Sequence, residues 1–291
     1  MFPNEHNELL QLSMHSILGK ESKISRVKRE GGGSINDTYS FEYAGDRYFL
    51  KHNSEKNFPL MFKNEASGLN ELRKCKDLLV PEVITDLVIH SDQYLILNYL
   101  KPIPEDNFFY ENLGIAIAKL HQITSDAFGF IEHNYMGSLV QLNNRKSSWP
   151  DFFYECRLEP LVKWCYDEKL ISGLVLKSFE NLNKRLGDIF PTEKPSLLHG
   201  DLWSGNKMNT EGGPTVFDPA VYYGHREMDI AMTRLFGGFG PEFYIAYNNT
   251  YALEKDYQKR TDICNLYPLL VHVKLFGASY LADVLTTIKR F

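Results

Sequence analysis

In the first hundred positions, apolar and polar residues alternate over short runs, which predicts β-strands joined by turns. We expect strands at residues 23–30, 38–44, 47–52, 82–90 and 94–100. Apolar residues recur at helical spacing at residues 7–18, which Gly19 ends, and at residues 59–75. The pattern predicts an antiparallel five-stranded sheet with a helix inserted between its third and fourth strands.

Beyond residue 100 the apolar spacing is mostly helical. The proline-containing stretch KPIPEDN, residues 101–107, predicts a boundary between an N-terminal lobe at 1–100 and a C-terminal lobe at 101–291. Helices are expected at residues 107–123, 149–169 and 171–190, short strands at 196–199 and 215–218, and more helices to the C-terminus, with breaks near Gly237–Gly240 and Pro268. The predicted fold class is α+β, with a mainly helical second lobe.

Composition and charge narrow the classes of function. The chain has 291 residues, of which 43% are apolar and 24% charged, as in globular proteins. A net charge of -5 argues against non-specific nucleic-acid binding. The four cysteines are scattered without a CxxC pair, so we expect reduced thiols in a cytoplasmic protein. We expect no membrane span, and no signal peptide in the opening residues MFPNEHNELL.

Lys51 and Glu65 are the first candidate functional pair. Glu65 shares a helical face with apolar residues, and a carboxylate there is costly unless it has a partner. Lys51 ends the apolar strand just upstream and is the candidate partner. The alternative is that Glu65 lies at the edge of the face, in solvent.

A glycine-rich stretch, GGGSIND, precedes Lys51. Its Gly31, Gly32, Gly33 and Ser34 would let backbone N–H groups approach phosphate oxygens. The stretch matches neither common phosphate-binding motif, so a flexible hairpin loop is the alternative.

The stretch HGDLWSGN, residues 199–206, carries the strongest candidate chemistry. Asp201 follows an apolar strand, Asn206 comes five residues later, and Asp218 lies twelve residues further on, after another apolar strand. Magnesium prefers hard oxygen ligands, so Asn206 and Asp218 are predicted to hold Mg²⁺ at the ends of neighbouring strands. Asp201 is then the base that takes a proton from a substrate hydroxyl, a division of roles typical of kinases. Any one of these residues alone would be more typical of a turn, and only their combination favours a metal site.

Four other residues are expected to support the site rather than to react. We expect His199 to shape the loop by hydrogen bonding, and His121 to be a hydrogen-bonded core histidine. Asp229 is expected to brace the loop as an acceptor. Trp203 lies among small and polar neighbours, which favours a partly exposed aromatic floor for a substrate over a core position.

Together these motifs resemble the fructosamine kinase (ketosamine-3-kinase) family. The resemblance rests on GGGSIND, YFLKHN, NEASGL, LLHGDLWSGN, VFDPAVYYGHREMDIAMTRLFGGF and KLFGASYL, and runs from about residue 20 to the C-terminus. Trp203 and Ser204 separate it from the related aminoglycoside and choline kinases.

The resemblance implies a two-lobed protein-kinase-like fold that binds ATP and Mg²⁺. It implies transfer of the γ-phosphoryl group to the 3-hydroxyl of a ketosamine, on a glycated protein or a free amine, with release of the amine afterwards. Lys51 would hold ATP phosphates, braced by Glu65, and the backbone of Asn98, Tyr99 and Leu100 would form the hinge beside adenine. The family often has an acidic residue where this chain has Asn98.

Two other functions stay open at this stage. One is a kinase of the same fold that acts on a different hydroxyl, such as that of an aminoglycoside or a choline-like amine. The other is a nucleotide-binding pseudokinase that serves as an interaction module. The presence of Lys51, Asp201, Asn206 and Asp218 disfavours the second. The sequence does not predict an oligomeric state.

Overall fold

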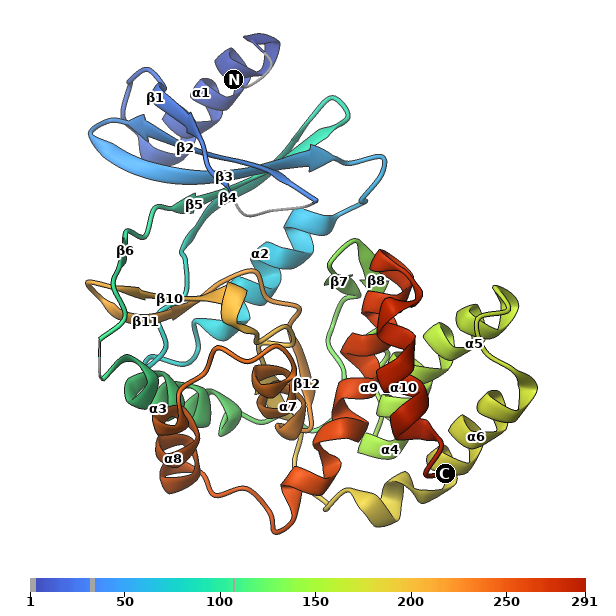
Figure 1. Ribbon diagram of the computed structural model, residues 1–291. Coiled ribbons are helices and arrows are strands. Elements are labelled where there is room, and N and C mark those ends of the chain that lie inside the picture. The colour runs from blue at the N-terminus through green and yellow to red at the C-terminus, as the bar shows by residue number, and fades with distance from the viewer. Residues whose placement is uncertain (1–3, 32–34, 107) are drawn as a thin grey trace.

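The computed structural model describes residues 4–31, 35–106 and 108–291 (Figure 1). Its N-terminal part is built on one antiparallel sheet in the order β1–β2–β3–β5–β4. The strands are β1 (Ser25–Arg29), β2 (Asp37–Tyr43), β3 (Asp46–Ser54), β4 (Val83–Ile89) and β5 (Asp92–Asn98). The predicted five-stranded sheet is confirmed, with strand ends shifted by one or two residues.

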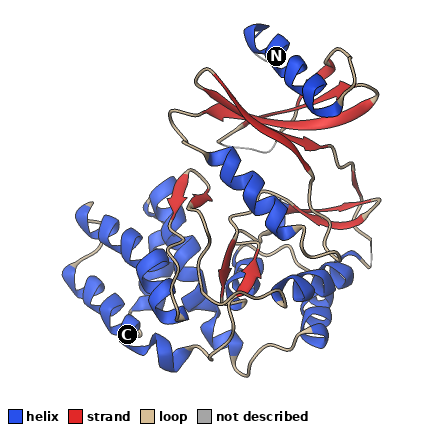
Figure 2. Ribbon diagram, turned by 180° about the vertical axis from the view of Figure 1, so that it is seen from behind, coloured by secondary structure: helices blue, strands red, loops and turns tan. Residues whose placement is uncertain are grey.

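Two helices cover opposite faces of this sheet, α1 (Asn4–Leu18) and α2 (Met61–Leu72) (Figures 1 and 2). Because side chains of a strand alternate between faces, Leu50 packs with Leu10 of α1, while Lys51 faces α2. The helix predicted between the third and fourth strands is therefore present. It lies between the sheet and the rest of the molecule, so it can bring a side chain to Lys51.

The C-terminal part is mainly helical, as predicted. Its helices are α3 (Phe109–His121), α4 (Trp149–Phe153), α5 (Glu159–Asp167), α6 (Gly173–Ile189), α7 (Glu227–Leu235), α8 (Pro241–Thr250), α9 (Tyr257–Phe276) and α10 (Leu281–Ile288). In Figure 1, α9 and α10 lie beside α4, α5 and α6, whereas α3 and α8 pack together on the other side. The boundary between lobes at residue 100 stays a prediction.

Short strands in this part of the chain flank the candidate residues. They are β6 (Pro102–Ile103), β7 (Asn134–Met136), β8 (Leu139–Gln141), β9 (Ser196–Leu198), β10 (Lys207–Thr210), β11 (Gly213–Val216) and β12 (Tyr222–Gly224). Strand β10 pairs with β11 and β6, β9 with β12, and β7 with β8. The register of Lys207 opposite Val216 puts Asn206 and Asp218 at the same end of the β10–β11 hairpin. Their predicted position at the ends of neighbouring strands is confirmed.

One prediction for the helices is wrong. The break expected near Pro268 is absent, because α9 continues through it from Tyr257 to Phe276. Proline removes one backbone donor, but Pro268 lies among buried residues of the core, so packing stabilises the helix around it. The helix expected at 149–169 is present as α4 and α5, which are joined without a gap by a π-helical turn at Tyr154–Leu158 that contains the fully buried Arg157.

Among the residues that the structure describes, no helix is both long enough and apolar enough to cross a membrane. All four cysteines are buried, and none is bonded to another.

Candidate active site

A cleft of about 670 Å³ is lined by both parts of the chain. The N-terminal part contributes Lys51 and Glu65, and the loop 199–206, here called the catalytic loop, contributes Asp201, Trp203 and Asn206. Asp218 lies in the same cleft. The structure therefore brings six of the predicted site residues together, although up to 167 positions separate them along the chain.

Lys51 lies at the centre of this group. Its Nζ is 2.6 Å from Oε1 of Glu65 and 2.6 Å from Oδ1 of Asp218, and its side chain is only 4% exposed. Burial alone would lower the pKa of Lys51, but the two carboxylates outweigh it and raise that pKa above its ordinary value. The lysine is therefore charged at neutral pH. The predicted pair is present, and Glu65 is not the solvated residue of the alternative interpretation.

Asp201 is held in a partly buried position by the turn that follows it. Nδ2 of Asn206 donates to Oδ2 of Asp201 at 3.0 Å and to the Asp201 carbonyl at 2.9 Å. Burial raises the pKa of Asp201 to about 7; the Asn206 hydrogen bond opposes this, and the charges of Asp218 and Asp229 add to it. A carboxyl group with such a pKa can accept and release a proton near neutral pH.

The backbone of the catalytic loop is fixed by its neighbours. Gly200 has φ +83°, and a Cβ there would lie 2.0 Å from the carbonyl oxygen of Ala220, so this position requires glycine. His199 is buried, which lowers its pKa. Its Nε2 donates to the Phe217 carbonyl at 3.0 Å, and its Nδ1 accepts the Asp201 N–H at 3.2 Å. His199 therefore shapes the loop as a neutral side chain, as predicted.

Asp229 of α7 holds the backbone of the catalytic loop through hydrogen bonds. Its carboxylate accepts the backbone N–H of His199 at 2.7 Å and that of Gly200 at 2.9 Å. Nε2 of His121 lies 3.2 Å from the same carboxylate, and its Nδ1 lies 2.8 Å from the hydroxyl of Tyr247. The predictions of a bracing acceptor at Asp229 and a hydrogen-bonded core histidine at His121 are confirmed.

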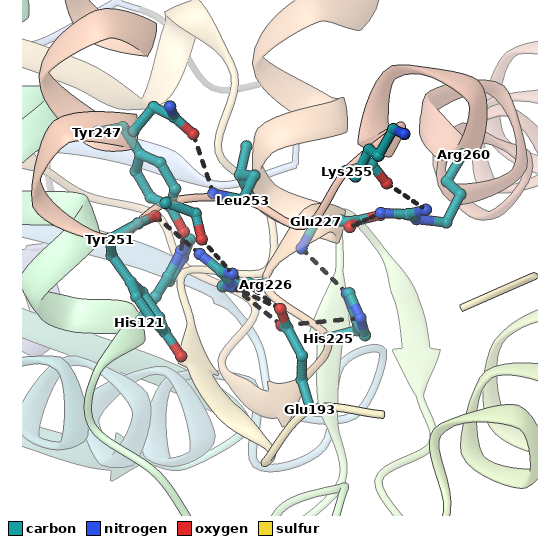
Figure 3. A network of polar contacts seen from close by, with 12 residues as sticks. His121, Glu193, His225, Arg226, Glu227, Tyr247, Tyr251, Leu253, Lys255 and Arg260 are labelled. Atoms are coloured by element: carbon teal, nitrogen blue, oxygen red, sulfur yellow. Dashed lines mark hydrogen bonds and ion pairs between the residues drawn. The ribbon is translucent and has the colours of Figure 1, made fainter. Parts of the chain in front are cut away.

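The start of α7 is anchored by a buried network, drawn in Figure 3. Arg226 precedes the helix and donates through Nε and Nη2 to both carboxylate oxygens of Glu193, at 2.9 and 2.8 Å. Its Nη1 donates to the Tyr251 carbonyl at 2.9 Å. Glu227 pairs with Arg260 at 2.6 Å. These buried ion pairs hold the N-terminus of α7 in place. They therefore also fix the position of Asp229, which lies in the first turn of the helix.

We expect Asp229→Ala to lower the free energy of unfolding by about 3 kcal/mol, because two buried backbone N–H groups lose their acceptor. Urea unfolding measures the change. Asp229→Asn is the matched control, since its amide oxygen can still accept one of the two bonds, and we expect a smaller loss. Equal stability of Asp229→Ala and the parent would contradict the bracing role.

The donors at the loop end suit a hard divalent cation. Asn206 uses its Nδ2 for Asp201, which leaves its amide oxygen for a metal, and Asp218 uses Oδ1 for Lys51, which leaves Oδ2. Asp218 also has φ +54°, in the left-handed region that aspartate adopts more readily than most residues. Across residues 4–31, 35–106 and 108–291, no cluster of three or more His, Cys, Asp or Glu side chains could hold a metal. A cation bound by Asn206 and Asp218 would need further oxygens from phosphate and water.

Other predicted nucleotide contacts are less clearly positioned. Gly32, Gly33 and Ser34 lie outside the described residues, and Gly31 has open space around it. Asn98, Tyr99 and Leu100 are not among the residues that line the cleft. The N–H groups of Asn98 and Tyr99 already donate to the carbonyls of Glu82 and Arg47. That these three residues form a hinge beside adenine stays a prediction.

Sequence reasoning missed one side of the cleft. The β7–β8 hairpin contributes Met136 and Ser138, and the region from α7 to α10 contributes Phe236, His272 and Phe276. These residues lie on helices and loops whose apolar spacing is explained by packing, so no local signal marked them. The recurrence of aromatic residues beside glycines, in LFGGF and KLFGASY, was the one available hint.

Comparisons with known proteins agree with this geometry. The profile of the fructosamine kinase family matches residues 7–291. A Vibrio parahaemolyticus protein named as a probable ketoamine kinase is 41% identical over 275 residues, which is 93% of each chain. The solved structure of a Haemophilus somnus protein assigned as a fructosamine-3-kinase has a TM-score of 0.87 at 28% identity, covering 97% of this chain and 96% of its own.

A more distant similarity concerns the fold alone. An aminoglycoside phosphotransferase solved with AMP-PNP and hygromycin B has a TM-score of 0.61 at 16% identity, covering 96% of this chain and 97% of its own. Together with the nearer relatives, it confirms the predicted protein-kinase-like fold.

Proposed function

The chain belongs to the fructosamine kinase family and is an ATP-dependent phosphotransferase, and from that premise we propose that it phosphorylates the 3-hydroxyl of ketosamines. One observation carries the proposal: a buried cation, a carboxyl group with a pKa near 7 and two free oxygen donors line the same cleft. They belong to Lys51, Asp201, Asn206 and Asp218. Phosphoryl transfer needs positioned phosphates, charge stabilisation and a proton acceptor, and these residue types supply all three.

Lys51 is proposed to bind phosphate oxygens of ATP, with Glu65 keeping its ammonium group in place. Asn206 and Asp218 would hold Mg²⁺, which neutralises charge that develops on the phosphate oxygens. The backbone of Gly31, Gly32, Gly33 and Ser34 would add N–H donors to the phosphates. Adenine would lie against Asn98, Tyr99 and Leu100, where the proposed lobes 1–100 and 101–291 meet.

Asp201 is proposed as the base of the transfer step. The proton of the acceptor hydroxyl moves to a carboxylate oxygen of Asp201 while the hydroxyl oxygen bonds to the γ-phosphorus. The bond from that phosphorus to the β–γ bridging oxygen breaks, and ADP leaves. Trp203 is 37% exposed in the same cleft and would stack against the sugar. We propose that the 3-phosphorylated adduct then decomposes in solution and frees the amine.

Turnover with a synthetic fructosyl or ribulosyl amine tests the proposal. We expect ATP-dependent formation of a phosphorylated ketosamine, with NMR assigning the phosphate to C3 and a later rise in free amine. Transfer to an aminoglycoside or to choline, with none to any ketosamine, would replace the proposal with the aminoglycoside- or choline-kinase alternative.

The raised pKa of Asp201 gives a pH prediction. The base must be deprotonated, so kcat/KM for ATP should fall by about tenfold per pH unit below about 7 and be level above it. The sign follows from the shift: a carboxyl group with its ordinary pKa of 3.8 would stay ionised throughout this range. Initial rates between about pH 5.5 and 8.5 check it, with Mg²⁺ kept saturating. A level profile down to the lowest pH would contradict the role of Asp201.

A further inference from the structure

Beyond Asp201 the cleft continues along a row of aromatic side chains, here called the aromatic wall, formed by Trp203, Phe236, His272, Phe276 and Tyr280. Along the wall, each ring contacts the next. The ring centroids of Trp203 and Phe236 are 6.3 Å apart, those of Phe236 and His272 are 5.0 Å apart, and those of His272 and Tyr280 are also 5.0 Å apart. The wall is therefore a formed surface that begins next to the proposed base.

Two apolar side chains of the wall are exposed to solvent. Phe276 is 58% exposed and Phe236 is 41% exposed, and both face the cleft. His272 is fixed, since its Nδ1 donates to the Pro268 carbonyl at 2.7 Å. A contiguous exposed apolar surface inside a cleft is typical of a ligand-binding site.

The charges around the wall limit what it can bind. Among the described residues that line the cleft, Lys51 is the only lysine or arginine, and it is paired with Glu65 and Asp218. The cations of the adjoining helices point elsewhere. The guanidinium of Arg234 lies 3.9 Å from the ring centre of Tyr244, and Nζ of Lys274 lies 5.1 Å from that of Trp164. A carboxylate placed on the wall would lose water without gaining a lysine or arginine partner.

On the basis of the proposed function, we propose that the aromatic wall beyond Trp203, formed by Phe236, His272, Phe276 and Tyr280, binds the amine substituent of the ketosamine and selects alkyl or aryl substituents that carry no carboxylate. A ketosamine bears its amine at C1, close to the reacting hydroxyl at C3. When that hydroxyl lies at Asp201, the substituent extends into the next part of the cleft, where the wall begins. The amine itself is protonated at neutral pH, and a cation is favoured against aromatic rings.

Matched acceptors test the selection. We expect kcat/KM for the fructosyl adduct of butylamine to exceed that for the adduct of 4-aminobutyrate by at least about tenfold, because the two differ only by the terminal carboxylate. The adduct of benzylamine should react at least as well as that of butylamine. Equal values for butylamine and 4-aminobutyrate would overturn the proposal.

Two variants locate the effect on the wall. Phe276→Ala and Tyr280→Ala should each lower kcat/KM for the benzylamine adduct at least about fivefold more than for the methylamine adduct, which is too short to reach the wall. Phe108→Ala is the matched control, because Phe108 is an aromatic residue with 65% exposure that does not line the cleft. Phe108→Ala should change kcat/KM for the benzylamine adduct and for the methylamine adduct by the same factor. Melting temperatures verify that each variant is folded.

The outcomes separate this inference from the function on which it rests. If every ketosamine is phosphorylated and the wall variants lower all of them equally, the selection is wrong and the kinase activity stands. If no ketosamine is phosphorylated although ATP binds, the proposed function fails, and the inference fails with it.

Discussion

Asp201→Asn is expected to lower kcat by at least about a hundredfold while changing the affinity for ATP little, since a positioned general base contributes about 10²–10⁴ to a rate. The amide keeps the shape of the carboxyl group and can still accept the hydrogen bond from Nδ2 of Asn206. It cannot take the proton of the acceptor hydroxyl. Single-turnover transfer and equilibrium binding of an ATP analogue measure the two effects separately.

The matched variant is Asp218→Asn, which removes a carboxylate from the same cleft with the same change of atoms. Because Asp218 is proposed to bind metal and contacts Lys51 at 2.6 Å, its loss should weaken Mg²⁺-dependent ATP binding as well as turnover. A loss of ATP affinity in Asp201→Asn as large as that in Asp218→Asn would show that Asp201 positions the nucleotide and is not the base.

The substitution Asp201→Asn should also change the stability of the fold. The pKa of Asp201 is about 7 in the folded state, above its ordinary value of 3.8. Between pH 3.8 and about 7 the folded protein therefore binds more protons than the unfolded chain. The free energy of unfolding therefore falls as the pH rises toward about 7, and Asp201 destabilises the fold where it is ionised. Asp201→Asn should then melt at a higher temperature than the parent at alkaline pH, as expected where a functional group is kept at the expense of stability.

Local patterns predicted the N-terminal sheet because its strands alternate between two packed faces. Leu50 and Lys51 are adjacent in sequence but face α1 and α2, so the exception to the apolar pattern of β3 marked the functional side chain. Asp201, Asn206 and Asp218 were also predictable, because their spacing after two apolar strands follows Lys51, Glu65 and a glycine-rich stretch in the order that kinases use. The helix break predicted at Pro268 is wrong, because burial of this residue in the C-terminal core outweighs the loss of one backbone hydrogen bond.

The aromatic wall could not be predicted for a different reason. Phe236 and Phe276 lie on or beside helices that also pack against the core, so their hydrophobicity carries no sign of exposure. Only the relative position of α7 and α9 brings them to one cleft, and that position depends on contacts distant in sequence, such as Glu227 of α7 with Arg260 of α9. Chemistry that depends on single side chains was visible in the sequence, whereas a surface built by packing was not.

Lys51→Met is expected to raise the KM for ATP by at least about tenfold and to lower kcat as well, since phosphate positioning contributes to both binding and the transfer step. Methionine fills a similar volume but leaves the carboxylates of Glu65 and Asp218 without their cation. Removing one partner of a buried ion pair also destabilises a fold by about 3–5 kcal/mol, so activity and stability will change together. A control must separate the two.

Lys207→Met provides that control, because Lys207 is also 4% exposed and its Nζ lies 2.6 Å from a carboxylate oxygen, on Glu105. Its ammonium group lies near the rings of Phe109 and Tyr110 and does not line the cleft. Both substitutions should lower the free energy of unfolding, but only Lys51→Met should change the KM for ATP strongly. If the two lysine variants lost ATP affinity to the same degree, the effect would come from stability alone, and Lys51 would not be the phosphate-binding residue.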